Sequence, residues 1–254
     1  MKHALSIAGS DSCGGAGLQA DLKTFAAFGV DGASVITAVT AQNTQGVHAI
    51  QLMPAALVQA QLDAVFDEMM IAAVKIGMLG DGGIATTVAA QLDRRRPPFT
   101  VLDPVLRATS GAQLLDATAL ELLRVQMLPR VDCLTPNLAE AAALLNAPCA
   151  RTEQDMEAQG RALLAFGPRA VLMKGGHADL PEAVDLLVTA RSTRRFAATW
   201  IATNQLHGTG CMLAAGVAAG VVLGDDLADA VARARTHLRR VLTGRQSAPS
   251  AHAS

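Results

Sequence analysis

The chain has 254 residues, of which 51% are hydrophobic and 17% charged. Such an apolar composition excludes disorder for the body of the chain and suits an α/β domain with a large core. The formal net charge of −1 and the aromatic content of 3% supply neither the basic field nor the stacking platforms of a nucleic-acid binder or of a protein that binds anionic membranes. We therefore expect a small-molecule partner, and neither nucleic acid nor membrane.

The lack of a recognisable targeting signal and the spacing of the cysteines both predict a cytoplasmic protein. The amino terminus, MKHALSIAGSDS, has too short an apolar part and too polar an end for a signal peptide, and no apolar run reaches the roughly 18 residues of a membrane span. Paired spacing, which would indicate a disulfide framework or structural zinc, is absent among the four cysteines, Cys13, Cys133, Cys149 and Cys211.

Short apolar runs alternate with helical patterns along the chain. Strands are predicted at residues 3–9, 33–42, 72–78, 99–105, 132–137 and 170–176, and then a hairpin of strands at 182–189 and 193–199. Two helices are predicted from apolar stripes, the first formed by Leu18, Leu22 and Phe25, the second by Val58, Leu62, Val65, Phe66 and Met69. Three more are predicted to begin near Thr152, Gly208 and Asp225, the last of them ending near Gly244.

Several strand runs are almost continuous in apolar residues, as in strands covered on both faces. The alternation of strands and helices predicts right-handed βαβ units and a mainly parallel sheet between two helical layers, which is a three-layer α/β/α fold. We expect residues 1–244 to form a single domain and residues 245–254 a disordered tail.

The segments that follow the strands are polar or rich in glycine. In a parallel sheet, ligands bind beyond the carboxyl ends of the strands, so these segments, together with the start of the helix at Gly208, are the candidate site. They comprise residues 9–17, 42–44, 77–78, 103–105, 137–140, 174–176 and 207–216.

The first of these segments contains Gly15-Ala-Gly17-Leu-Gln-Ala20, a nominal GxGxxA dinucleotide fingerprint. The fingerprint also needs an acidic residue at the end of the second strand, and that strand ends in Ala41-Gln42-Asn43. An NAD-dependent oxidoreductase therefore stays an alternative that the sequence disfavours.

Gly208-Thr209-Gly210-Cys211 is the most informative motif. The first turn of a helix presents backbone N–H groups and a positive dipole, which suit a phosphoryl group in transfer. The same field lowers the pKa of a thiol, so Cys211 is predicted to have a pKa near neutrality, as a general base requires. The alternative is a buried, inert cysteine.

Four further polar residues are candidates for binding a metal ion or a phosphate group. Asp103 follows a strand and could hold Mg²⁺ through water, although an Asp-Pro turn explains it as well. Asn137 and Glu140 have a spacing that helix capping alone could produce, and Lys174 could neutralise a phosphate. No histidine, including His177 and His207, has ligand spacing, so none receives a metal assignment.

The ordered motifs AGSDSCGGAGLQADLKTF, VITAVTAQNTQGV, KIGML, LDPV followed by SG, LTPNLAEA, MKGGH and HGTGC resemble the hydroxymethylpyrimidine kinase/phosphomethylpyrimidine kinase family of thiamine biosynthesis. The resemblance implies a ribokinase-like three-layer fold and a homodimer. It also implies use of ATP and Mg²⁺ to phosphorylate 4-amino-5-hydroxymethyl-2-methylpyrimidine and then its monophosphate, and it leaves a monovalent cation open as a further cofactor.

The resemblance also implies roles for single residues. Gln42 would pair with the aminopyrimidine, to which an amide offers a donor and an acceptor, while Asp21, Met78 and Val105 would line the substrate pocket. Cys211 would be the base, and Gly208, Thr209 and Gly210 the anion hole. Lys174 and Asn137 would bind the nucleotide, and Asp103 and Glu140 the metal, through water.

Three departures from the family pattern are visible: Gln205-Leu206 before His207, Thr109 where a lysine is common, and a short carboxyl-terminal segment after Leu242. The nearest alternative function is a pyridoxine/pyridoxal kinase of the same superfamily, which also phosphorylates a hydroxymethyl group on a nitrogen heterocycle. A non-catalytic nucleotide sensor with this fold is a further alternative.

Overall fold

The computed structural model describes residues 2–43, 46–106, 117–176, 181–202 and 207–246. Within these residues a nine-stranded sheet has the order β3-β2-β1-β4-β5-β6-β7-β8-β9. The strands are β1 His3–Asp11, β2 Asp31–Asn43, β3 Gly46–Leu52, β4 Ile71–Ile76, β5 Thr100–Leu102, β6 Cys133–Leu134, β7 Ala170–Lys174, β8 Ala183–Thr189 and β9 Thr193–Ala198.

The central strands from β2 to β7 run parallel, while β3, β8 and β9 each pair antiparallel with their neighbour. The predicted mainly parallel sheet and the predicted hairpin near the carboxyl end are therefore confirmed. All the predicted strands are present, with shifted ends. β3 was missed because it is an edge strand with mostly exposed side chains, so it carries little of the apolar alternation that marks a strand.

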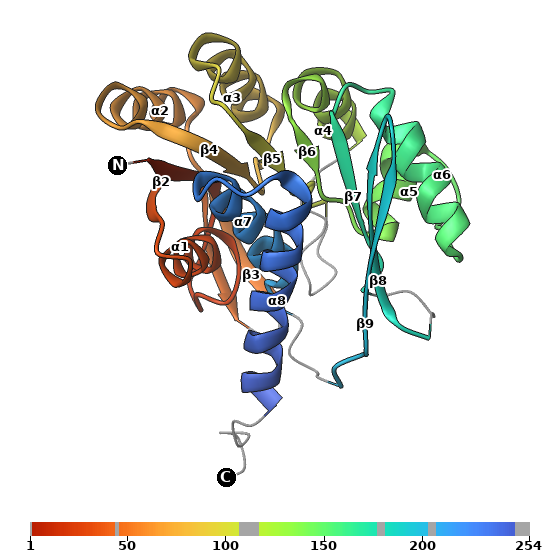
Figure 1. Ribbon diagram of the computed structural model, residues 1–254. Helices are drawn as coiled ribbons and strands as arrows, with labels where there is room; N and C mark the ends of the chain where they lie inside the picture. Colours follow the sequence, from red (N-terminus) through yellow and green to blue (C-terminus); the bar gives the residue numbers. More distant parts are fainter. Residues whose placement is uncertain (1, 44–45, 107–116, 177–180, 203–206, 247–254) are drawn as a thin grey trace.

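Helices cover both faces of the sheet (Figure 1). They are α1 Gly17–Ala27, α2 Ala55–Glu68, α3 Gly82–Arg95, α4 Ala117–Leu122, α5 Leu138–Leu145, α6 Glu153–Leu164, α7 Thr209–Val222 and α8 Leu227–Gln246, and α4 continues into a π-helical turn at Leu123–Met127 and a 3₁₀ turn at Leu128–Arg130. Each face has its own apolar core. One core lies under α2, α3, α5 and α6, and the other under α1, α7 and α8. The predicted three-layer α/β/α fold is confirmed.

The apolar stripe of α2 explains why this segment is helical and where it packs. Val58 and Leu62 are fully buried, and Val65 and Phe66 lie partly buried against the same core. The helix ends at Glu68, because the backbone of Met69 is extended. At α6, Thr152 and Asp155 form a reciprocal capping box, which fixes the predicted start of that helix.

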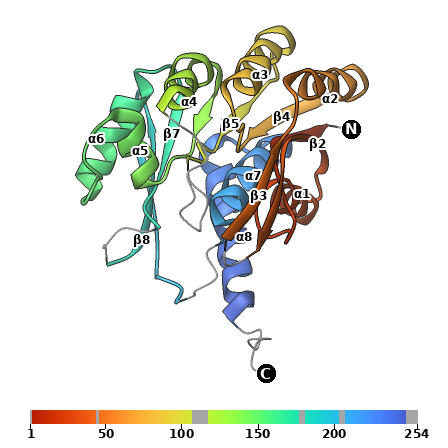
Figure 2. The ribbon, with the colours of Figure 1, turned by 180° about the vertical axis from the view of Figure 1, so that it is seen from behind.

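Helix α7 is apolar on all sides, since it lies between the sheet and two other helices. Its glycines let α8 approach closely: a Cβ added at Gly216 or Gly220 would lie 2.8 Å from the Cβ of Ala234 or Ala230. Figure 2, from behind, shows α7 and α8 lying together. This packing fixes the position of the amino-terminal turn of α7, on which the candidate site depends.

The last helix, α8, continues to Gln246, two residues past the expected domain end at 244. The rest of the expected tail, residues 247–254, lies outside the described residues. Among the helices that the structure describes, none combines the length and the apolarity of a membrane span.

Candidate active site

A cavity of about 740 Å³ opens at the carboxyl ends of the parallel strands, within the size range of small-molecule sites. Nearly all the predicted site residues line it: Gln42, Met78, Asp103, Val105, Asn137, Glu140, Lys174, Gly208, Thr209, Gly210 and Cys211. These residues come from five strand ends and from the start of α7, so the strand ends line one cavity, as expected for a parallel sheet.

The turn before α7 depends on Gly208. Its φ of 77° lies in the left-handed region, which favours glycine, and a Cβ there would collide with the carbonyl oxygen of Gly15. The Gly-rich loop after β1 and the start of α7 are therefore in backbone contact. A Cβ on Gly210 would lie 3.1 Å from Lys174 Nζ and 3.3 Å from Asp103 Oδ2, so these two charged groups lie against the first turn of α7.

Lys174 is held between two carboxylates. Its Nζ lies 2.7 Å from Asp103 Oδ1 and 3.9 Å from Glu140 Oε2. Asn137 and Glu140 form a capping box at the start of α5, so the capping interpretation of their spacing is confirmed, while both side chains also line the cavity. Burial, together with the charge of Asp103, raises the pKa of Glu140 to about 7, against the opposing effect of Lys174.

The described residues contain no group of three His, Cys, Asp or Glu side chains arranged as metal ligands. Mg²⁺ in phosphotransferases usually keeps several waters and binds one or two carboxylates together with substrate phosphates. Asp103 and Glu140, on either side of Lys174 and beside the first turn of α7, fit that mode of binding.

Cys211 lines the cavity with a partly exposed side chain. Burial raises the pKa of its thiol to about 11, and the charges of Asp21 and Asp103 add to this; the charge of Lys75 and the backbone N–H of Gly17 act in the opposite direction. The expectation of a pKa near neutrality is therefore wrong for the unliganded protein. Desolvation and two nearby carboxylates outweigh the field of the helix start.

Asp21 does not line the cavity as expected. It is fully buried beneath it, where its Oδ2 accepts hydrogen bonds from Lys75 Nζ at 2.7 Å and from Ser6 Oγ at 2.5 Å. Lys75 lines the cavity instead. Burial opposes the charge of Lys75, but the Asp21 carboxylate raises its pKa above the usual value. The sequence signal for Lys75 was a lone lysine within the apolar strand AAVKIGM.

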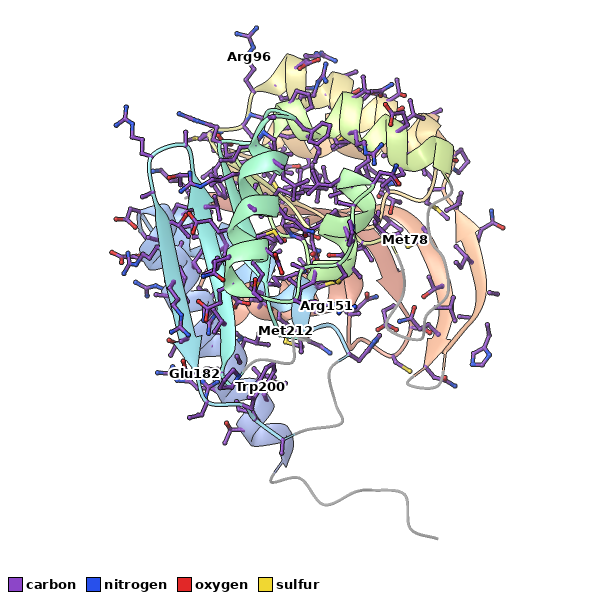
Figure 3. The ribbon with its side chains drawn as sticks, turned by 90° about the vertical axis from the view of Figure 1, so that its right-hand side faces the viewer. Met78, Arg96, Arg151, Glu182, Trp200 and Met212 are labelled. Atoms are coloured by element: carbon purple, nitrogen blue, oxygen red, sulfur yellow. The ribbon has the colours of Figure 1, made fainter. Side chains whose placement is uncertain are left out.

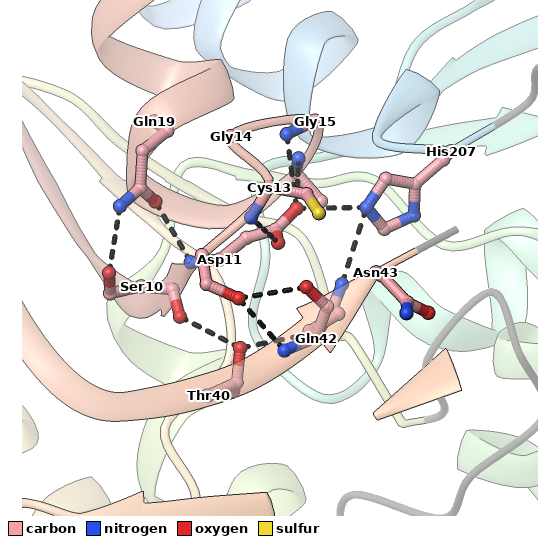
Figure 4. Close-up of polar contacts among 12 residues, drawn as sticks. Ser10, Asp11, Cys13, Gly14, Gly15, Gln19, Thr40, Gln42, Asn43 and His207 are labelled. Carbon is pink, nitrogen blue, oxygen red and sulfur yellow. Dashed lines mark hydrogen bonds and ion pairs between the residues drawn. The ribbon is translucent and has the colours of Figure 1, made fainter. Parts of the chain in front are cut away.

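Gln42 belongs to a polar cluster that sequence reasoning did not anticipate (Figure 4). His207 Nε2 lies 2.9 Å from Asp11 Oδ2 and 3.2 Å from Gln42 Nε2. Asp11, at the end of β1, also accepts hydrogen bonds from the backbone N–H groups of residues 13, 15 and 16. Burial alone would raise the pKa of Asp11, but these hydrogen bonds hold it below its ordinary value. A polar Asp11 just before the Gly-rich loop was the available signal.

The cavity extends along α8. Met78 and Trp200, which both line it, lie far apart (Figure 3). At the Trp200 end, Arg235, Leu238 and Arg239 of α8 contribute, and Arg235 also pairs with Asp185 of β8. None of these was predicted, because no local pattern links α8 to the strand ends. Two of the departures, Thr109 and Gln205-Leu206, lie outside the described residues.

Comparison with known proteins agrees with this geometry. A family model described as phosphomethylpyrimidine kinase matches residues 11–253. The chain is 54% identical over 217 residues to the hydroxymethylpyrimidine/phosphomethylpyrimidine kinase of Salmonella typhimurium. The aligned region covers 85% of this chain and 82% of that relative.

Two solved structures have similar folds. The phosphomethylpyrimidine kinase of Clostridium difficile superposes with a TM-score of 0.85 at 38% identity, over 95% of this chain and 100% of that one. An ADP complex of Bacillus subtilis pyridoxal kinase superposes with a TM-score of 0.85 at 31% identity, over 93% of this chain and 89% of that one.

Proposed function

The chain belongs to the phosphomethylpyrimidine kinase family, and on that premise we propose that it phosphorylates 4-amino-5-hydroxymethyl-2-methylpyrimidine and then the resulting monophosphate, in thiamine biosynthesis. It is a phosphotransferase with a ribokinase-like fold. The observation that carries the proposal is the shared cavity, in which an amide suited to an aminopyrimidine and a glycine-lined helix start face one space.

ATP is the phosphoryl donor in this proposal, a role supported by the ADP complex of the similar pyridoxal kinase. The Gly208–Gly210 turn would hold the transferring phosphoryl group, since backbone N–H groups at a helix start bind anions. Lys174 would balance the phosphate charge, which requires it to exchange part of its contact with Asp103. Asp103 and Glu140 would hold Mg²⁺ through water, and the bound ion would neutralise charge on the phosphates.

Cys211 is our candidate for the group that accepts the proton of the substrate hydroxymethyl. Its thiol is neutral in the unliganded protein, so deprotonation has to accompany binding of the substrates. In the second reaction the nucleophile is a phosphate oxygen. A phosphate monoester is largely ionised near neutral pH, because its second pKa is about 6. That reaction therefore needs no base.

The test is the initial rate of ADP release with the aminopyrimidine alcohol, with its monophosphate and with pyridoxal, under the same conditions. We expect higher rates with the two pyrimidines, since Gln42 offers both a donor and an acceptor to the aminopyrimidine edge. A higher rate with pyridoxal would favour the pyridoxal kinase alternative. A thermal shift with NAD and none with ATP would favour the oxidoreductase.

We further propose, from the family resemblance, that the protein is a cytoplasmic homodimer with residues 1–244 as one domain. Light scattering of the purified protein tests the dimer, with a monomeric mass as the contrary result. The rate of ADP release in potassium and in tetramethylammonium buffers tests for a monovalent cation.

A further inference from the structure

His207 Nε2 has two polar neighbours that place opposite demands on it. One is the carboxylate of Asp11, 2.9 Å away, and the other is the side-chain amide of Gln42, 3.2 Å away (Figure 4). The Asp11 side chain is 3% exposed, and three backbone N–H groups donate to it, which stabilises the ionised form. An ionised carboxylate only accepts hydrogen bonds. His207 Nε2 must therefore carry a hydrogen atom and donate it to Asp11.

A protonated Nε2 cannot accept a hydrogen bond from the Gln42 NH₂ group. With the amide nitrogen toward His207, hydrogen atoms would face each other across 3.2 Å. With the amide oxygen toward His207, Nε2–H serves both Asp11 and Gln42. Which end of an amide is oxygen is decided by such a network, and here the network requires the oxygen on the His207 side.

The contact of Thr40 with the other terminal atom of the Gln42 amide indicates the same orientation. Its Oγ1 donates to the carbonyl oxygen of Ser10 at 2.9 Å and lies 3.4 Å from the terminal amide atom placed as Gln42 Oε1. Since its one hydrogen is used at Ser10, Thr40 can only accept from Gln42, which again makes that atom the nitrogen. The contacts at both ends of the amide thus favour the same orientation.

The orientation of the amide decides how a substrate binds. Gln42 keeps one N–H and one oxygen lone pair for the substrate. An aminopyrimidine therefore pairs with its 4-amino group toward the amide oxygen, on the His207 side, and with ring N3 toward the amide nitrogen, on the Thr40 side. The hydroxymethyl group is on C5, next to the amino-bearing carbon, so it lies on the same flank. His207 immediately precedes the Gly208–Cys211 turn.

We propose that Asp11 and His207 are positioning residues that determine specificity: they hold the Gln42 amide with its oxygen toward α7, so that the substrate binds with its hydroxymethyl group facing the Gly208–Cys211 turn. The inference rests on the proposed function. A reversed amide would pair with a reversed ring and turn the hydroxymethyl group away from the turn.

The 4-oxo analogue of the substrate, 5-hydroxymethyl-2-methylpyrimidin-4-one, tests this orientation. It presents an acceptor where the substrate has its amino group and an N3–H donor where the substrate has an acceptor, so it needs the reversed amide. We expect the wild-type protein to prefer the amino compound by about 10²-fold or more in kcat/KM, because a site built to pair with one hydrogen-bonding edge strongly rejects an edge whose donors and acceptors are exchanged.

In His207→Leu the amide can reverse, so we expect this preference to fall about tenfold or more, with a higher KM for the amino compound and a lower KM for the oxo compound. His207→Gln keeps an N–H donor near the Nε2 position and should restore part of the preference. His48→Leu, which replaces an exposed histidine on β3, is the matched control and should leave the preference unchanged.

Equal losses on both substrates in His207→Leu, with the preference unchanged, would refute the positioning role while leaving the proposed function intact. Failure of the wild-type protein to phosphorylate the aminopyrimidine would instead refute the proposed function. If His207→Leu does not fold, ¹⁵N NMR of the wild-type imidazole decides the positioning role. A hydrogen on Nε2 at pH 7.5 supports the inference, and an Nε2 without hydrogen overturns it.

Discussion

The rate at which iodoacetamide alkylates Cys211 in the unliganded protein should rise about tenfold per pH unit up to pH 10. The reason is that its thiol has a pKa of about 11 and only the thiolate reacts. At pH 7.5 about 3 in 10,000 Cys211 thiols are ionised, compared with about one in ten in a cysteine peptide with a pKa of about 8.5. The reactive thiolate is thus roughly 300-fold scarcer at Cys211 than in the peptide, and alkylation should be slower, although a thiolate of higher pKa is the better nucleophile and offsets part of this ratio.

Peptide mapping by mass spectrometry measures this rate separately from the exposed Cys13 and Cys149. A plateau near pH 8 would refute the electrostatic reasoning. Asp21→Asn provides a second arm. It removes a charge that raises the pKa of Cys211 and leaves Lys75 uncompensated, so alkylation should accelerate at a fixed pH. Breaking a buried pair costs about 3–5 kcal/mol, which should lower Tm by roughly 6–20 °C.

Three further outcomes follow from the site. Cys211→Ala should slow phosphorylation of the alcohol more than that of the monophosphate, whose oxygen is already ionised, and equal losses in separate assays would contradict this. Gly208→Ala should lower Tm and activity together, since a left-handed residue with a side chain costs about 1–2 kcal/mol even before the collision with Gly15. Gly210→Ala, whose Cβ would crowd only the side-chain ends of Lys174 and Asp103, should lower kcat with little change in Tm. Glu140 has a pKa of about 7 in the folded protein and about 4.3 when unfolded, so between these pH values the folded state holds a proton that the unfolded state has lost. Raising the pH from 5 to 7.5 should therefore reduce the stability contributed by this group, and urea unfolding of Glu140→Gln should show a weaker decrease, whereas an unchanged pH dependence would count against the raised pKa.

Local patterns in the sequence were sufficient to predict the layers of the fold and the edge of the sheet at which the candidate site lies. Buried strands are short apolar runs, and amphipathic helices repeat their apolar residues every three or four positions. Because parallel strands end at one edge, the loops with Gln42, Asp103, Lys174 and Gly208 could be assigned to one site without coordinates. β3 could not be predicted in this way, because most of its side chains are exposed and do not alternate between apolar and polar.

Only the tertiary structure decided the charges at that site. Asp21 and Lys75 are 54 residues apart, and nothing near either residue shows that they pair beneath the cavity. Asp11 and His207 are 196 residues apart, yet the hydrogen bond between them determines the orientation of the Gln42 amide. The pKa of Cys211 depends on how much water reaches the thiol and on which carboxylates lie near it. Such quantities are sums over neighbours in space, whereas the apolar periodicity that predicted the fold is a property of neighbours along the chain.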